Sequence, residues 1–201
     1  MGVEPSEAIK RAERMLKGAN LGLKQFERGE GEQKYIGLYN CVSFGRNLTF
    51  ALQKATSEND VFEEWYEDRI QVLKEDEVCS HMKSLRNHME KEGSPGADAY
   101  GSFSGDLSEL QRQVPDWADE VFVIDEWGGS GFSVETADGD EVKFYLEFEN
   151  VDVESGLFFP DLEDDDFGYE TPTDAEDELK YYLKILAELV RDANEKFDGD
   201  G

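Results

Sequence analysis

The residues best suited to chemistry lie in one short segment, HMKSLRNHMEKEG, which spans residues 81–93. Its polar and charged side chains of interest are His81, Arg86, Asn87, His88 and Lys91. An arginine binds phosphate through its planar fork of N–H donors, and an imidazole transfers protons near neutral pH. A group of this kind could bind an anionic substrate and transfer a proton, provided that the fold brings its members together.

Helical geometry predicts that these residues diverge. At 100° per residue, Arg86 borders the apolar stripe of Met82 and Met89, whereas His88 points about 200° away from Arg86. Arg86 and His88 therefore cannot easily serve one substrate. His81 and His88 are seven residues apart and share a face, which we expect to be solvated.

Our preferred interpretation of Arg86 is structural. An arginine at the edge of an apolar stripe needs a carboxylate partner, and we expect one from Glu64, Asp68 or a neighbouring helix. The alternative is that Arg86 has no carboxylate partner and reaches solvent.

Other polar residues favour structural roles. Arg46 lies within the apolar second helix, and we expect it to form an ion pair with the third helix. Cys41 and Cys79 lie in helical patterns and are interpreted as buried thiols. Their spacing relative to the two histidines does not fit a zinc site, and no nucleophile or cofactor motif is present.

One loop gathers several carboxylates. In DLEDDDFG, the weak candidates for metal ligands are Asp161, Asp164 and Asp166. A calcium loop needs glycine at its sixth position and glutamate at its twelfth, where this chain has Asp166 and Pro172. We therefore expect a solvated loop and no metal.

Apolar residues recur at helical spacing in five segments, residues 6–28, 34–56, 60–74, 76–92 and 174–197. Gly37 and Gly45 weaken the second helix and predict close packing against a neighbour. Thr173 and Glu176 form a capping box before the last helix. The stripe of Leu183, Leu186 and Val190 predicts that this helix docks, either on the sheet or on the bundle.

Between residues 119 and 159 the apolar period changes to two, which predicts an antiparallel meander with one apolar face. Asp138-Gly139 predicts a tight hairpin turn, and GGSG at residues 128–131 a looser one. The fold class is therefore α+β. We expect a helical bundle (1–95), a β-meander (119–160) and a C-terminal docking helix (173–197), forming one structural unit.

Charge is the dominant feature of the composition. The chain has 48 acidic and 20 basic residues, a net charge of -28. At molar salt the screening length falls to about 3 Å, so a protein adapted to salt tolerates such self-repulsion. We therefore expect a halophilic protein, in which only a local basic patch would indicate an anionic partner. Residues 1–16 have no apolar run, and no apolar stretch approaches the ~20 residues of a spanning helix, so we also expect a cytoplasmic protein without membrane contact.

The segment 41–94 resembles an uncharacterised prokaryotic, haloarchaeal-type group that is distantly similar to HEPN domains. The resemblance rests on CVSFGRNLTFALQK, FEEWYEDR and LRN…KEG, and more loosely on WGGSGFSVETADGDEVKFY and the terminal helix. HEPN domains are all-helical, and many are RNA-cutting toxins or components of defence systems.

The HEPN nuclease motif is incomplete in this chain. Arg86 and Asn87 match its first two positions, but the histidine position falls on Lys91, and His88 comes three residues too early. A lysine would need strong desolvation to act near neutral pH. We therefore expect a non-enzymatic HEPN-like interaction or regulatory protein of a toxin–antitoxin or defence set, with a protein partner or as a homodimer. The alternative is a divergent metal-independent ribonuclease that uses Arg86 and Asn87 with Lys91 or His88.

Overall fold

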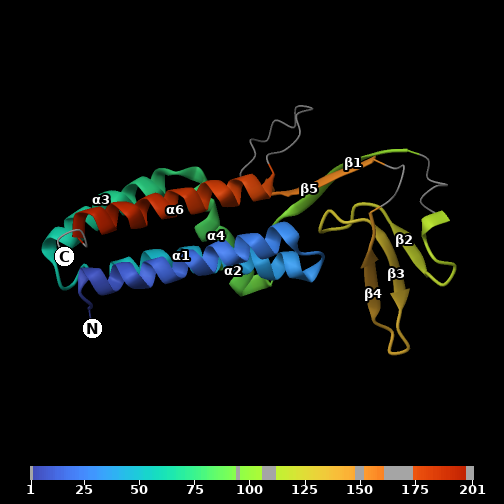
Figure 1. The fold of residues 1–201 in the computed structure, drawn as a ribbon, viewed down its shortest axis with the longest axis horizontal. Coiled ribbons are helices and arrows are strands. Elements are labelled where there is room, and N and C mark those ends of the chain that lie inside the picture. Colours follow the sequence, from blue (N-terminus) through green and yellow to red (C-terminus); the bar gives the residue numbers. More distant parts are fainter. Residues whose placement is uncertain (1, 94–95, 106–111, 148–151, 161–173, 198–201) are drawn as a thin grey trace.

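The computed structural model describes residues 2–93, 96–105, 112–147, 152–160 and 174–197. It confirms the α+β fold class. A long helical bundle occupies one end of the molecule, a two-stranded ribbon leads away from it, and a small antiparallel sheet stands at the far end (Figure 1). No helix in these segments has the length and apolar character needed to cross a bilayer.

Helices α1 (Pro5–Arg28) and α2 (Glu32–Gln53) form an antiparallel hairpin. Glycines allow their backbones to approach closely. A Cβ on Gly22 would lie 2.4 Å from the backbone nitrogen of Cys41, and one on Gly37 would lie 2.4 Å from that of Phe26. The predicted close packing at Gly37 and Gly45 is confirmed, because the Tyr182 ring fills the space above Gly45.

Helices α3 (Asp60–Glu75) and α4 (Glu77–Glu92) are defined by capping side chains. Asn59 accepts a hydrogen bond from the backbone N–H of Phe62, and Asp76 accepts one from that of Cys79, each at 2.8 Å. Each cap satisfies an N–H that the helix leaves without a partner. Helix α4 ends at Gly93, whose φ of 69° suits glycine.

Helix α6 (Ala175–Phe197) returns to the bundle, where it packs on α1 and contacts α4. Leu186 is fully buried, and the rings of Phe62, Trp65 and Phe197 pack at centroid distances of 4.8–5.4 Å. The predicted docking is therefore on the bundle and not on the small sheet. The N-terminal cap is Asp174, which accepts a hydrogen bond from the N–H of Glu176 at 2.7 Å; Thr173 lies outside the described residues.

The ribbon corrects one prediction. Strand β5 (Asp152–Phe158) pairs antiparallel with β1 (Asp98–Ser104) and is not part of the meander. The sequence of β1 is rich in small residues and lacks the apolar alternation that marks the other strands. Burial of Leu157 and Phe159 in the bundle core ties β5 to the helices.

The meander consists of β2 (Glu120–Phe122), β3 (Gly131–Glu135) and β4 (Glu141–Tyr145), in that spatial order. The Asp138-Gly139 hairpin is confirmed. Gly139 has a φ of 85°, and the N–H of Thr136 donates to the carbonyl of Asp140 at 2.8 Å. The GGSG segment joins β2 to β3, so it is a turn between strands and not a phosphate loop.

Candidate functional site

The polar residues of α4 do not converge. Arg86 Nη2 lies 2.6 Å from Glu90 Oε1, and His88 Nδ1 lies 3.9 Å from Glu92 Oε1, each pair being one helical turn apart. Asn87 and Lys91 are exposed. Because Arg86 and His88 each face a different glutamate, one phosphodiester could not contact both of them.

The partner of Arg86 differs from the expected one. Its side chain is 23% exposed and pairs with Glu90 of its own helix, not with Glu64 or Asp68. The weaker contact to Asn87, at 3.4 Å, also stays within α4. Arg86 therefore does not link α4 to another helix, because an i,i+4 pair forms without any tertiary contact.

The remaining sequence candidates have structural surroundings or lie outside the described residues. The His81 ring packs against Phe159 at a centroid distance of 5.4 Å, so His81 is part of the packing between α4 and the chain beyond β5. Cys41 and Cys79 are buried free thiols, as predicted. Asp161, Asp164 and Asp166 lie outside the part of the chain that the structure describes.

Arg46 does not form the expected ion pair with α3. Its guanidinium stacks over the Phe50 ring at 4.3 Å and donates to Thr49 Oγ1 at 3.1 Å, so both contacts lie within α2. Among the described residues, no three His, Cys, Asp or Glu side chains are placed to hold a metal ion.

The sequence analysis predicted an apolar face on the meander but not that this face would form an exposed aromatic patch. We call it the aromatic face, and its members are Trp117, Val121, Phe132, Val142 and Phe144. Trp117 is 61% exposed and Phe144 is 42% exposed. The sequence left open whether the last helix would cover this face or pack on the bundle, and in the structure α6 packs on the bundle.

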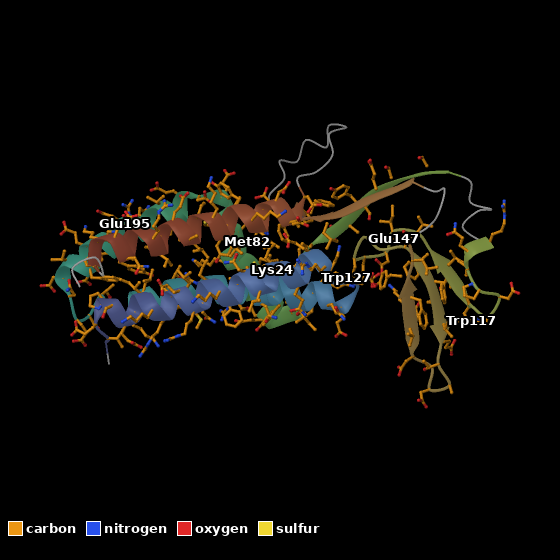
Figure 2. The ribbon with its side chains drawn as sticks, viewed as in Figure 1. Lys24, Met82, Trp117, Trp127, Glu147 and Glu195 are labelled. Atoms are coloured by element: carbon orange, nitrogen blue, oxygen red, sulfur yellow. The ribbon has the colours of Figure 1, made fainter. Side chains whose placement is uncertain are left out.

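The aromatic face is a packed cluster and not a row of loose side chains. Phe132 and Phe144 are cross-strand neighbours whose rings stack at 5.0 Å, and the Trp117 ring meets Phe132 edge-on at 5.2 Å. Phe132 is thereby 4% exposed, while its neighbours remain open to solvent. Figure 2 places Trp117 on the side of the meander remote from the bundle.

The other face of the meander is fixed to the helices by a short loop around Asp125. The Asp125 side chain is 3% exposed and accepts hydrogen bonds from the N–H groups of Trp127 and Gly129, each at 3.0 Å. It also accepts from the Tyr145 hydroxyl at 2.8 Å and from Lys143 Nζ at 3.3 Å. Four donors around one carboxylate tie this loop to β4.

The same loop carries the contact with the bundle. Trp127 packs against Tyr35 of α2 at 6.2 Å, and Lys34 Nζ donates to the Trp127 carbonyl at 3.3 Å. Figure 2 shows Trp127 between the end of the bundle and the meander. Ile124, which precedes Asp125, has a φ of 59°, a strained value for a β-branched residue that the surrounding hydrogen bonds must maintain.

The contacts of the Asp125 cluster shift the pKa values of its members. Burial opposes the charge on Asp125, but its hydrogen bonds outweigh burial, and the pKa of Asp125 lies below its ordinary value. Burial and the neighbouring Asp125 raise the pKa of Tyr145. Burial of Lys143 is outweighed by hydrogen bonds to Glu126 and Asp125, so its pKa is raised. The hydrogen bonds of the cluster therefore favour the charged forms of Asp125 and Lys143 and hold the loop.

No protein-family model matches the chain, and no curated protein or solved structure shows significant similarity to it. The class of protein is therefore defined by the molecule itself. It is an α+β protein in which a helical bundle carries, through a ribbon and a hydrogen-bonded loop, a small sheet with an exposed aromatic face.

Proposed function

We propose that this chain is a non-enzymatic interaction or regulatory protein, and that the aromatic face is where it binds a protein partner. The observation that carries this proposal is the solvent exposure of Trp117 and Phe144 on a sheet whose opposite side is firmly fixed. Clustered, exposed aromatic residues mark protein interfaces, because they bury a large area at low entropic cost.

The charge around the aromatic face indicates the chemistry of the partner. Between residues 113 and 147 the sequence has ten acidic residues and one basic residue, Lys143. Lys143 lies on the opposite side of the meander, paired with Asp125 and Glu126. A partner with an apolar centre and a basic rim would complement this surface, whereas a second copy would bring two acidic rims together.

The ribonuclease alternative has less support. It requires Arg86 and a proton-transfer group at one site, and Arg86 instead pairs with Glu90 while His88 faces Glu92. Membership of a toxin–antitoxin or defence set follows only from the HEPN-like resemblance, and the identity of the neighbouring gene would test it.

The interaction is tested with four tagged proteins incubated in extracts of the native cells. They are the wild type, Phe144→Ser, Val142→Arg and the control Phe50→Ser. Phe50 is 39% exposed on α2, close to the 42% of Phe144, so the control removes a similar area from a distant surface. Val142→Arg leaves the stacked rings intact and adds a cation that should repel a basic rim.

We expect at least one protein to be retained by the wild type and by Phe50→Ser, but lost with Phe144→Ser and Val142→Arg. With that partner purified, both variants on the aromatic face should bind about tenfold or more weakly. Identical sets of proteins on all four baits would contradict the proposal. RNA cleavage by the wild type that is lost in Arg86→Ala would favour the ribonuclease instead.

A further inference from the structure

A second surface feature, on the bundle, has the opposite charge to the rest of the molecule. A hollow of about 380 Å³ lies among α2, α3, α4 and α6, and we call it the cationic pocket. Arg46, Lys74 and Lys83 line it, together with the polar side chains of Thr49 and Ser80. No Asp or Glu is among its described lining residues.

This absence of carboxylates is unusual for this chain, in which acidic residues outnumber basic ones by 48 to 20. Three other hollows on the described surface each include two or more carboxylates. The hollow between the bundle and the meander is lined by Glu27, Glu30 and Glu147. The groove of α1 and α6 is lined by Glu13 and Glu195, and the groove of α3 and α6 is lined by Glu188 and Asp192. The cationic pocket is therefore a local exception to a strongly negative surface, and its field favours anions.

Arg46 is held ready to bind an anion. Its stacking on Phe50 and its hydrogen bond to Thr49 fix the plane of the guanidinium. The bond to Thr49 uses one of the five N–H donors. Neither contact neutralises the charge, and no carboxylate of the described residues forms an ion pair with Arg46. An arginine fixed in this way can bind a planar or tetrahedral oxyanion through two parallel hydrogen bonds.

The pocket contributes no negative charge of its own near neutral pH. Burial raises the pKa of Tyr66 to about 12 and also raises the pKa of the Cys79 thiol. Both side chains therefore remain protonated and neutral. Asp76 lies beside Cys79 and accepts a hydrogen bond from its backbone N–H at 2.8 Å, but it does not line the pocket. Because Cys79 remains a thiol, the arrangement is suited to binding and not to nucleophilic catalysis.

The remaining walls are apolar or aromatic. Tyr66 and Tyr182 are almost fully buried, and Ile70 and Leu73 are half-buried beside them. A volume of about 380 Å³ is near the lower end of the range for small-molecule sites. The ligand that fits such walls and three cations is small, carries more than one negative charge and has an apolar part.

We propose that the cationic pocket binds a small phosphate monoester, with the phosphate held by Arg46, Lys74 and Lys83 and the organic part against the Tyr66 wall. A phosphate monoester carries about 1.5 to 2 negative charges at neutral pH, which suits three cations better than a single carboxylate does. This site is on the opposite part of the molecule from the aromatic face and is independent of the partner proposed there.

The probe is phenyl phosphate, titrated calorimetrically into the full chain at one fixed concentration of potassium chloride. Benzoate tests for a ring with a single negative charge, and inorganic phosphate tests for the anion without a ring. The variants are Arg46→Gln and Lys83→Gln, and Lys83 is an exposed residue whose change leaves the core intact. The control is Lys24→Gln, which removes an exposed cation of α1 that lines the groove of α1 and α6 and not the cationic pocket (Figure 2).

We expect saturable binding of one phenyl phosphate per chain, and weaker binding of benzoate and inorganic phosphate. Arg46→Gln and Lys83→Gln should each weaken binding by about tenfold, and Lys24→Gln by less than about twofold. Three outcomes would overturn the proposal. They are the absence of saturable binding of phenyl phosphate, equally tight binding of benzoate, and a loss with Lys24→Gln as large as with the pocket variants.

Discussion

Arg86 is the residue whose role changes most between sequence and structure. Its partner is Glu90, one turn further along α4, and both side chains reach solvent. An i,i+4 pair with partial access to solvent contributes little, because solvent screens the charges and ordering two long side chains costs entropy. A large structural role would require a partner on another element.

We therefore expect Arg86→Ala to lower the free energy of unfolding by less than about 1 kcal/mol. Urea unfolding in potassium chloride measures the effect, with Lys91→Ala as an exposed control on the same helix. If the free energy of unfolding fell by about 3–5 kcal/mol instead, Arg86 would be the partner of a buried carboxylate, which the substitution leaves unpaired.

Cys41 gives the protein a pH dependence on the alkaline side. Its thiol is fully buried, and burial raises the pKa of Cys41 from its ordinary value of 9.0 to about 12. Between these two values the unfolded chain loses a proton that the native state keeps. The free energy of unfolding must therefore fall as the pH rises above about 9.

We expect the free energy of unfolding of Cys41→Ala to fall less steeply above pH 9 than that of the wild type, by about 1 kcal/mol per pH unit. Urea unfolding at a series of pH values from neutral to alkaline measures both slopes. Because the substitution also leaves a small cavity, the slope and not the absolute stability is the relevant quantity. Parallel curves would show that the Cys41 thiol ionises equally in both states.

At the scale of elements, α6 determines how the molecule is assembled. Leu179, Leu186 and Ala193 are fully buried against the bundle. Asp192 connects α6 to α3, since its carboxylate accepts hydrogen bonds from Trp65 Nε1 at 2.9 Å and Arg69 Nε at 2.6 Å. By packing on the helices, α6 leaves the aromatic face of the meander open.

Leu186→Ala should lower the free energy of unfolding by about 2–5 kcal/mol, because it removes a fully buried side chain and leaves a cavity. Leu21→Ala is the matched control, since Leu21 is 66% exposed on α1 and should change stability by less than about 0.5 kcal/mol. Thermal and urea unfolding measure both. Similar small effects for the two leucines would mean that α6 does not dock as described.

For the whole molecule, the most pronounced feature of the composition is the net charge of -28. Negative charge is spread over the helices and the meander, and the cationic pocket is a local exception. Mutual repulsion among so many carboxylates opposes the compact state unless salt screens it. The halophilic character expected from the composition therefore has a direct test in stability.

We expect the midpoint of thermal unfolding to rise as potassium chloride increases from dilute to molar concentration. Sucrose at matched water activity is the control, because it favours compact states without screening charge. A midpoint indifferent to potassium chloride, or one raised equally by sucrose, would contradict adaptation to salt.

The sequence by itself determined the features that depend on near neighbours. Periodicity and turn chemistry within a few residues predict the helices and the Asp138-Gly139 hairpin. The same local patterns predict that the Leu186 stripe docks and that Cys41 and Cys79 are buried. The α+β class follows from the same local signals, because an amphipathic helix or an alternating strand must bury its apolar side.

Only the tertiary structure decided which surfaces meet and which remain open. Three features involve residues that are far apart in the sequence. They are the pairing of β5 with β1, the exposure of the aromatic face, and the assembly of Arg46, Lys74 and Lys83 from three helices. Periodicity identifies an apolar face but not the element that covers it. The final contacts depend on small differences among alternative packings of the same amphipathic elements, and those differences arise only when the whole chain is folded.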